Sequence, residues 1–418
     1  MQYPPFAVDP AWGEHPADLW ADAAVTAMKL GGVDHLFFVS GSELSFYQEA
    51  IAKAGALDRP APRLITMVHE GVALNAAMGS AMVSGRPTAT AAHVDVGTLN
   101  YGAGIHTAWR GGAPVLITGG AGPRAYPGSM PGSRESGVQW VQEPRDQGEI
   151  VRQYTKLDHR MEHQDNPGLM VSRLLQVAMS EPRGPAYLTF PQETALLPVP
   201  GAVARFPTRD QLGLARPAWP DPADARQAAR WLIDARNPCI FTARSGRDPE
   251  AVAELVRLAE LLAVPVMDTN RTDRMNFPTD HPLYGTGPSP QDADMLLILE
   301  APVPFSPPRE CPAAGAKIVW VDNDPVQSRY KTMEFRADLW LPVGSAAAAQ
   351  AIREAAEGML SAGDLGRIAQ RRVRLEQEKQ EEVARQERLA LEAGHRRPMH
   401  PRWVGYQIGK ILQPDTIL

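Results

Sequence analysis

The stretch ITMVHEGVALNAAMGSAM, residues 65–82, decides the fold class. Its opening ITMV is apolar and predicts a buried strand, whereas the remainder is rich in small residues and predicts a helix. An ionisable pair, His69 and Glu70, stands at the turn between them. A strand that runs directly into a helix is the repeating unit of α/β folds, so this stretch predicts a parallel sheet flanked by helices.

The same alternation of strands and helices continues on both sides of this stretch. After the proline-rich residues 196–224, which predict an interdomain linker, a second alternating region predicts a Rossmann-like domain. The predicted fold class is therefore α/β, with two doubly wound parallel-sheet domains and a helical linker. Further buried strands of the first domain are expected at HLFFVS (35–40), TATAAH (88–93), PVLITGG (114–120) and PAYLTF (185–190).

Length and composition divide the chain into segments. Its 418 residues exceed what one ordinary core accommodates. The run after about Ala346 is dense in charges and predicts a solvated linker helix. The last stretch, HPRWVGYQIGKILQPDTIL, predicts an amphipathic helix, a turn and the start of a strand. The expected segments are a first domain over 1–200, a central domain over 201–345, a helical linker over 346–400 and the start of a third domain over 401–418.

The composition argues against several classes of function. A formal net charge of −6 offers no basic surface for nucleic acid, and no run approaches the ~20 apolar residues that span a membrane. The first residues carry no signal-peptide pattern. Cys239 and Cys311 lack metal-binding spacing and fit a reducing compartment. We therefore expect a cytoplasmic protein that binds neither nucleic acid nor a membrane.

Three predicted strands of the first domain end in turns that suit a ligand. The turns are SGSELSF after the first strand, HEG after the second and HVDVGTLN after the third. Open α/β sheets bind ligands at the carboxyl ends of their strands, and a helix N-terminus receives polar or anionic groups. The residues that these turns offer are Ser40, Gly41, Glu70, His93, Gly97 and Thr98.

Several of these signals also have structural interpretations. A glutamate in the first turn of a helix complements the positive end of the helix dipole. His93 fits a hydrogen-bonded core histidine as well as an acid/base group. The pair at residues 69 and 70 is not a zinc-protease motif, because Ala73 stands where the second histidine would be. His159 and His163 have the spacing of a helical metal pair, but the charged stretch HRMEH predicts a solvated surface.

The order of these motifs resembles the acetolactate-synthase-like family of thiamine-diphosphate enzymes. HEGVALNAAMG is similar to a block of the family's pyrimidine-binding domain, and IVWVDNDP (318–325) is similar to a segment of its central domain. The last stretch resembles the start of the diphosphate-binding domain. The resemblance covers the chain from about Trp20 onward. It implies a lyase, decarboxylase or carboligase that acts on a 2-oxo acid, a 2-hydroxy ketone or a 2-hydroxyacyl thioester.

The resemblance implies a role for Glu70 in activating the cofactor. This residue stands at the position of the family's glutamate, which bonds a ring nitrogen of the pyrimidine and favours the imino tautomer. A carboxyl group that shares a proton with a neutral ring benefits from apolar surroundings. The neighbours Met67, Val68 and Val72 suit that demand.

Other site residues also follow from the resemblance. His93 stands where some decarboxylases of the superfamily carry an active-site histidine, and Gln142 in WVQE resembles a glutamine that faces the substrate. Ser40 and Gly41 replace the family's common Pro-Gly, which weakens an assignment to acetolactate synthesis itself. The implied cofactor-binding residues are Ser40, Gly41, Glu70, Gly97, Thr98 and Asn100.

The metal half of the family's cofactor site has no counterpart in the sequence. The family binds Mg²⁺ with a G-D-G motif followed by an asparagine, but here Gly363-Asp364 precedes Leu365 and no asparagine follows Asn323. We expect the Mg²⁺ ligands outside this chain, on a partner subunit or in a C-terminal continuation. The protein would then be a homo-oligomer or a hetero-oligomer with a diphosphate-binding subunit.

Two other functions stay open. The chain could be a non-catalytic binding subunit of such a complex, although a subunit of that kind has no need of an ionisable group at residue 70. It could also bind a nucleotide or flavin through the central domain. TARSGRDP (242–249) lacks a clear dinucleotide fingerprint, so FAD is not expected.

Overall fold

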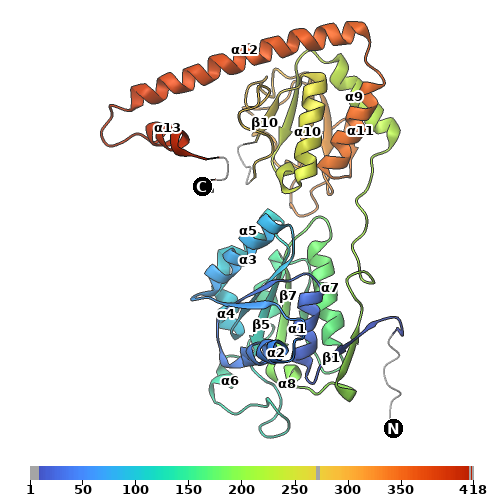
Figure 1. Cartoon of the computed structure of the whole chain (residues 1–418), viewed down its shortest axis with the longest axis vertical. Coiled ribbons are helices and arrows are strands. Elements are labelled where there is room, and N and C mark those ends of the chain that lie inside the picture. Colours follow the sequence, from blue (N-terminus) through green and yellow to red (C-terminus); the bar gives the residue numbers. More distant parts are fainter. Residues whose placement is uncertain (1–8, 270–273, 414–415, 417–418) are drawn as a thin grey trace. The chain divides into compact units, whose positions relative to one another are not determined.

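The computed structural model describes residues 9–269, 274–413 and 416 (Figure 1). The chain forms two compact units, Met1–Arg216 and Pro217–Leu418. Each unit is built on its own parallel sheet and has its own hydrophobic cores. The predicted α/β fold class with parallel sheets is confirmed.

The sheet of the first unit has six parallel strands in the order β3-β2-β4-β5-β7-β6. These strands are β2 (His35–Phe38), β3 (Arg63–Thr66), β4 (Thr88–Ala92), β5 (Val115–Ala121), β6 (Asp158–Arg160) and β7 (Ala186–Pro191). The helices are α1 (Trp20–Leu30), α2 (Ser45–Ala56), α3 (Glu70–Ser84), α4 (Val94–Asn100), α5 (Gly102–Gly111), α6 (Val138–Val141), α7 (Pro167–Met179) and α8 (Gln192–Ala195).

Helices cover both faces of this sheet because its strands are apolar on both sides. Leu36 and Phe38 of β2 pack into a core with α1, α2 and α7. Phe37 between them points the other way, into a second core with α3 and α5. The first unit is therefore doubly wound, as the continuously apolar strands predict.

Two local features of the first unit bear on the sequence motifs. The stretch after β4 forms two helices, α4 and α5, with Tyr101 between them. His159 lies in the short strand β6, where its Nε2 is 2.8 Å from Asp165 Oδ2. The helical metal pair with His163 is therefore not formed, because residues four apart in sequence share a face only within a helix.

The first unit extends beyond the predicted boundary at residue 200. The strand β8 (Val203–Phe206) lies inside the predicted linker and pairs antiparallel with β1 (Gly13–Pro16) near the other end of the unit. Phe206 and Ala204 of β8 join the first core. This long-range pairing holds the segment to the first unit, which continues to Arg216.

The sheet of the second unit has five parallel strands in the order β10-β9-β11-β12-β13. The strands are β9 (Pro238–Thr242), β10 (Val266–Asp268), β11 (Met295–Leu299), β12 (Lys317–Val321) and β13 (Leu339–Leu341). The helices are α9 (Pro222–Asp234), α10 (Pro249–Leu262), α11 (Ser345–Glu357), α12 (Ala362–Ala393) and α13 (Pro401–Ile411).

The two faces of this second sheet are covered differently. One face packs against α9, α10, α11 and the first part of α12. On the other face, Trp320 of β12 packs among Phe305 and Phe335, which lie in segments that are neither helix nor strand. Helices therefore join the core on only one of the two faces in the described part of this unit.

The predicted linker over 346–400 begins too early. Ala348, Ala349 and Ile352 of α11 are buried in the core of the second unit, so this helix belongs to the central domain. The guanidinium group of Arg371 in α12 is buried and donates to the backbone oxygens of Ala263 at 3.0 Å and Ala235 at 2.9 Å, among others. A buried guanidinium with several acceptors fixes the first part of α12 to the domain.

The end of the chain contains α13 where an amphipathic helix is predicted. The predicted strand after it falls on residues 414–418, of which only residue 416 is described. Among the described residues, no helix is both long enough and apolar enough to cross a membrane.

Candidate functional site

The three predicted turns lie at one edge of the first sheet. Strands β3, β2 and β4 are parallel neighbours, so their carboxyl ends meet. The turn after β2 carries Glu43, the turn after β3 carries Glu70 and the turn after β4 carries His93. The sheet topology therefore brings two carboxylates and an imidazole to the position where α/β folds bind ligands.

Glu70 is the first residue of α3, and its side chain is buried. Asn100 Nδ2 donates to its Oε2 at 3.0 Å, whereas the described residues make no hydrogen bond to Oε1. A Cβ on Gly97 would lie 3.0 Å from this Oε1, so glycine leaves open the space beside it. Asn100 therefore orients the carboxyl group, and Gly97 keeps one of its oxygens accessible.

His69, which the sequence leaves without a role, caps the same helix. Its Nδ1 accepts a hydrogen bond from the backbone N–H of Gly71 at 3.0 Å. A side-chain acceptor at this position satisfies one of the free N–H groups of the first helical turn. His69 thus fixes the start of α3, from which Glu70 projects.

The apolar neighbours expected around Glu70 are mostly turned away from it in the described part of the chain. Val68 is 93% exposed, Val72 is 49% exposed and Met67 is only partly buried. Val96 and Leu99 of the neighbouring helix α4 are also exposed, at 51% and 58%. Sequence proximity predicted contact with the carboxyl group, but most of these side chains point to the surface of the unit.

His93 forms a pair with Glu43, a residue that the sequence analysis did not select. Its Nε2 contacts Glu43 Oε2, which also accepts a hydrogen bond from Ser42 Oγ at 2.6 Å. Gln139 Nε2 donates to the other carboxylate oxygen at 3.1 Å. The bond from His93, aided by those from Ser42 and Gln139, holds the pKa of the buried Glu43 carboxyl down to about 2 despite its burial.

This ionised carboxylate determines which ring nitrogen of His93 carries a hydrogen. A carboxylate only accepts hydrogen bonds, so His93 Nε2 must carry a hydrogen. In the neutral imidazole the remaining nitrogen, Nδ1, is then the acceptor. The side chain of His93 is 24% exposed, whereas that of Glu43 is 2% exposed, so only the histidine of this pair is accessible to a substrate.

The backbone around His93 is tightly constrained. A Cβ on Gly41 would lie only 2.1 Å from Cδ2 of the His93 ring, so the turn after β2 requires glycine there. Val94, the residue after His93, is buried and has φ of +45°, a left-handed conformation that is strained for a β-branched side chain. Such strain concentrates at functional sites, where the surrounding structure enforces it.

Thr98 does not face a ligand. Its side chain is fully buried, and Oγ1 donates to the backbone oxygen of Val94 at 2.8 Å. The same oxygen is 2.9 Å from the hydroxyl of Tyr187 and 3.1 Å from Gln147 Nε2. Burial raises the pKa of Tyr187, so its phenol stays neutral within this network. The predicted contact between Thr98 and a cofactor is therefore replaced by a structural role.

The glutamine that reaches the site is Gln139, which lies near the predicted Gln142. Gln142 is half-buried at the end of α6, and the structure gives its side chain no contact with Glu43 or His93. The side chain of Gln139 is buried, and its Oε1 accepts from the backbone N–H of Glu135 at 2.9 Å. Ser40 is exposed two residues after β2, and its side chain makes no hydrogen bond to another described residue.

The missed residues carried weak signals. Glu43 lies inside SGSELSF, a stretch whose small residues predicted a turn suited to a ligand. A charged residue directly after a buried strand could have been selected together with His93. Gln139 lies in α6, a helix of only four residues between β5 and β6, which is too short for the sequence pattern to predict the direction of a side chain.

No cluster of three or more His, Cys, Asp or Glu side chains that could hold a metal ion occurs in the described part of the chain.

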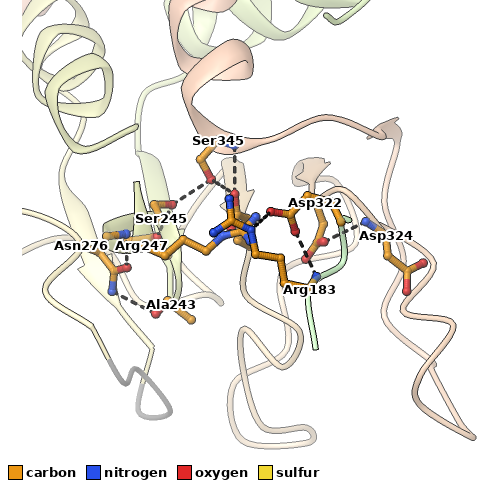
Figure 2. Close-up of polar contacts among 12 residues, drawn as sticks. Arg183, Ala243, Ser245, Arg247, Asn276, Asp322, Asp324 and Ser345 are labelled. Atoms are coloured by element: carbon orange, nitrogen blue, oxygen red, sulfur yellow. Dashed lines mark hydrogen bonds and ion pairs between the residues drawn. The ribbon is translucent and has the colours of Figure 1, made fainter. Parts of the chain in front are cut away.

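The second sheet places its own polar cluster at the carboxyl ends of β9 and β11. Glu300 Oε1 accepts from the backbone N–H of Ser345 at 3.0 Å and from its hydroxyl at 2.9 Å. Arg247 Nε donates to the other oxygen at 2.7 Å. Figure 2 shows Ser245, Arg247 and Ser345 converging at this point.

This cluster lies at the topological switch point of the second sheet. The strand order changes direction between β9 and β11, where flavodoxin-like sheets bind their ligand. The Glu300 carboxylate takes the first N–H of α11, the position that a phosphate group would use. The side chains of Glu300, Ser345 and Arg247 thus occupy the position at which such sheets bind a ligand.

Comparison with known families identifies both units. Residues 20–150 match the family described as "Thiamine pyrophosphate enzyme, N-terminal TPP binding domain". Residues 225–340 match "Thiamine pyrophosphate enzyme, central domain". The two matches follow the order in which the motifs occur in the chain.

Curated relatives align with about two thirds of the chain. Benzoylformate decarboxylase of Pseudomonas aeruginosa is 29% identical over 276 residues, 63% of this chain and 50% of that protein. The acetolactate synthase large subunit of Mycobacterium tuberculosis is 28% identical over 288 residues, 66% of this chain and 48% of that protein. Sulfoacetaldehyde acetyltransferase of Castellaniella defragrans is 29% identical over 291 residues, 68% of this chain and 44% of that protein. The chain spans about half the length of these relatives.

Solved structures share the fold. The benzoylformate decarboxylase of Polynucleobacter necessarius superimposes with a TM-score of 0.63 at 19% identity, over 81% of this chain and 61% of that chain. A thiamine diphosphate-dependent 4-hydroxybenzoylformate decarboxylase of Rhodococcus jostii gives 0.62 at 20% identity, over 80% and 62%. With both domains matched in order, the chain belongs to the thiamine pyrophosphate enzymes, carries their N-terminal and central domains, and is similar to acetolactate synthases among them.

Proposed function

We propose that the chain is the activating part of a thiamine-diphosphate-dependent enzyme that cleaves or forms a carbon–carbon bond next to a carbonyl group. The proposed substrate class is a 2-oxo acid, a 2-hydroxy ketone or a 2-hydroxyacyl thioester. The observation that carries the proposal is Glu70, a buried carboxyl group at a helix start with one oxygen bonded to Asn100 and the other left accessible beside Gly97.

The geometry around Glu70 fits the pyrimidine half of the cofactor. When bound, thiamine diphosphate supplies a nucleophilic carbon and an electron sink for the reaction. Glu70 Oε1 would hold a proton at the ring nitrogen, while Asn100 keeps Oε2 in place. Gly97 would leave room for the flat ring, because a larger residue there would place its Cβ against the carboxylate.

The Glu43–His93 pair would move protons on the substrate side. Glu43 fixes the hydrogen on Nε2, so Nδ1 of His93 is free to take a proton from a substrate hydroxyl or to return one. Gln139 and Ser42 keep the carboxylate ionised and oriented. Glu43 would thus be the group that orients the base His93 without contacting the substrate.

The diphosphate half of the site is proposed to come from outside the described residues, which contain no candidate metal cluster. Mg²⁺ would be bound there. The exposed side chains Val68, Val72, Val96 and Leu99 surround the turns that carry Glu70 and His93, and an exposed apolar group of this kind marks a binding surface. We propose that another domain or subunit covers these side chains and completes the site in an oligomer.

Cofactor binding tests this proposal. The chain would be titrated with thiamine diphosphate and Mg²⁺ alone, and again together with a separately produced diphosphate-binding domain from the same genome. We expect saturable binding in the mixture that is much tighter than that of either component. If the two proteins associate but bind no cofactor, the result would contradict the proposal. If they associate but show no turnover, the result would favour the alternative that the chain is a non-catalytic binding subunit.

A further inference from the structure

A cavity of about 260 Å³ lies at the carboxyl ends of β5, β6 and β7, away from the three turns that carry Glu70 and His93. The strand order places β3-β2-β4 in one half of the sheet and β5-β7-β6 in the other half. Arg124 follows β5, Arg160 ends β6 and Glu193 follows β7, and all three line the cavity. This cavity is therefore separate from the proposed cofactor site.

Glu193 is the unusual residue of this cavity. Its side chain is buried at 4% exposure, and Oε1 accepts from the backbone N–H of Arg124 at 2.8 Å. The other oxygen, Oε2, is buried and has no hydrogen-bond partner among the described residues. Burying a carboxylate oxygen without a hydrogen-bond donor lowers the stability of the fold. A ligand that places a donor group beside Oε2 would remove this cost.

A cation faces the same cavity. The guanidinium group of Arg160 makes one ion pair, from Nε to Glu162 Oε1 at 3.5 Å, and no hydrogen bond to another described residue. Its partner Glu162 is half-exposed, so the pair is weak. Burial and the nearby Arg124 lower the pKa of Arg160, although the carboxylates of Glu162, Glu193 and Glu143 act in the opposite direction. The cavity thus has a carboxylate oxygen without a donor and a guanidinium without a hydrogen-bonded anion among the described residues.

We propose that this cavity binds a small zwitterion of the α-amino acid class. The ligand's ammonium group would donate to Glu193 Oε2, and its carboxylate would accept from the guanidinium of Arg160. An ammonium group matches the buried carboxylate better than a hydroxyl does, because charge-assisted hydrogen bonds are about twice as strong as neutral ones. The volume suits a molecule of a few to about ten heavy atoms, since one water occupies ~30 Å³ of liquid.

Matched ligands test the ammonium contact in the full chain. Glycine, L-alanine, L-serine and L-aspartate would be titrated calorimetrically up to tens of millimolar, with L-lactate and propionate as controls that keep the carboxylate and lose the ammonium. We expect at least one amino acid to bind and lactate to bind about tenfold more weakly than alanine. Equal binding of lactate and alanine, or binding of none of the four amino acids because water alone fills the cavity, would overturn the proposal.

Matched variants test the residues. Glu193→Gln keeps the acceptor for Arg124 and should weaken amino-acid binding about tenfold or more without changing lactate binding. Glu162→Gln removes a charge at the exposed rim and should change affinity less than about threefold. If Glu193→Gln lowers the melting midpoint too far for titration, Arg160→Gln replaces it and should weaken amino acids and lactate alike. Unchanged amino-acid binding in the variant used would also overturn the proposal.

Discussion

Both sheets end in a buried glutamate beside the start of a helix, but the two glutamates are used differently. In the first unit, Glu70 has one oxygen bonded to Asn100 and the other accessible beside Gly97. In the second unit, Glu300 has both oxygens bonded, to Ser345 and to Arg247. The same position in a parallel sheet therefore leaves one carboxylate oxygen without a hydrogen bond to a described residue in one unit and has both oxygens bonded in the other.

The difference lies in which partners the chain itself supplies. A carboxylate whose acceptor sites are filled by its own protein gains stability and loses the capacity to bind a ligand. A carboxylate with a free oxygen retains that capacity at some cost in stability, as functional sites commonly do. We therefore expect substitutions at the first sheet edge to affect activity most, and substitutions at the second to affect stability most.

The largest effect is expected for Glu70→Gln. The amide cannot share a proton with the pyrimidine ring, so turnover of the assembled enzyme should fall by about 10²- to 10⁴-fold. The melting midpoint should change little, because an amide still accepts from Asn100. Steady-state kinetics and thermal melting measure both effects. Glu49→Gln on exposed α2 is the matched control and should leave both unchanged. Full activity of the Glu70 variant would remove the contrast between the two sheets.

Glu300→Ala should show the opposite behaviour. It removes the carboxylate that Arg247 and Ser345 share, and breaking a buried ion pair costs about 3 kcal/mol. Urea unfolding should show this loss in the second unit, while Glu392→Ala on the exposed side of α12 should show none. If the Glu300 variant unfolds at the same urea concentration as the wild type, the hydrogen bonds and ion pair of Glu300 do not stabilise the second unit.

Glu43→Gln should reveal a pH dependence with a defined sign. The carboxyl has a pKa of about 2 in the folded chain against an ordinary 4.5, so its contribution to stability is present above pH 4.5 and is lost as the pH falls toward 2. The shift corresponds to ~3 kcal/mol. Urea unfolding at pH 5, 4 and 3 should show the wild type approaching the variant as the pH falls.

The same variant should alter catalysis through His93. Without the carboxylate, the imidazole loses its fixed hydrogen, and turnover should fall by about 10- to 100-fold with a displaced pH–rate profile. Ser45→Ala on the neighbouring exposed surface is a control that should keep the wild-type profile. An unchanged profile in Glu43→Gln would show that the pair only supports the fold.

The smallest effect on stability is expected for Leu99→Ser. Leu99 is 58% exposed, so the free energy of unfolding of the isolated chain should change by less than about 0.5 kcal/mol. Association should weaken by about tenfold if this side chain is buried in an oligomer. Sedimentation velocity measures this, with the similarly exposed Leu57→Ser as control. Equal association of both variants would contradict the proposed covering of the site.

The fold could be predicted from the sequence where local pattern and burial agree. Continuously apolar strands and intervening helices predicted the parallel sheets, and small residues after the strands predicted the position of the site. Boundaries were less predictable. The pairing of β8 with β1 joins segments that are far apart in the sequence. The helix α11 was placed in the charged linker, although its buried face belongs to the core of the second unit.

The site was predictable only in part. Glu70 and His93 follow buried strands, so their positions were visible in the sequence, whereas the partners that set their chemistry come from distant segments. Glu43 reaches His93 across 50 residues and Gln139 reaches Glu43 across 96. For Thr98, spacing shows where the residue lies along a helix but not that its side chain is buried and hydrogen-bonded to Tyr187 and Gln147.

The sequence by itself determined the strand–helix alternation, the presence of Glu70 and His93 at strand ends and the absence of a G-D-G metal motif, because these depend on local pattern alone. Only the tertiary structure decided which carboxylate stays accessible. Asn100 bonds one oxygen of Glu70, whereas Arg247 and Ser345 bond both oxygens of Glu300. The physical reason is that hydrogen-bond satisfaction depends on side chains brought together by the packing of a whole sheet, which no local pattern contains.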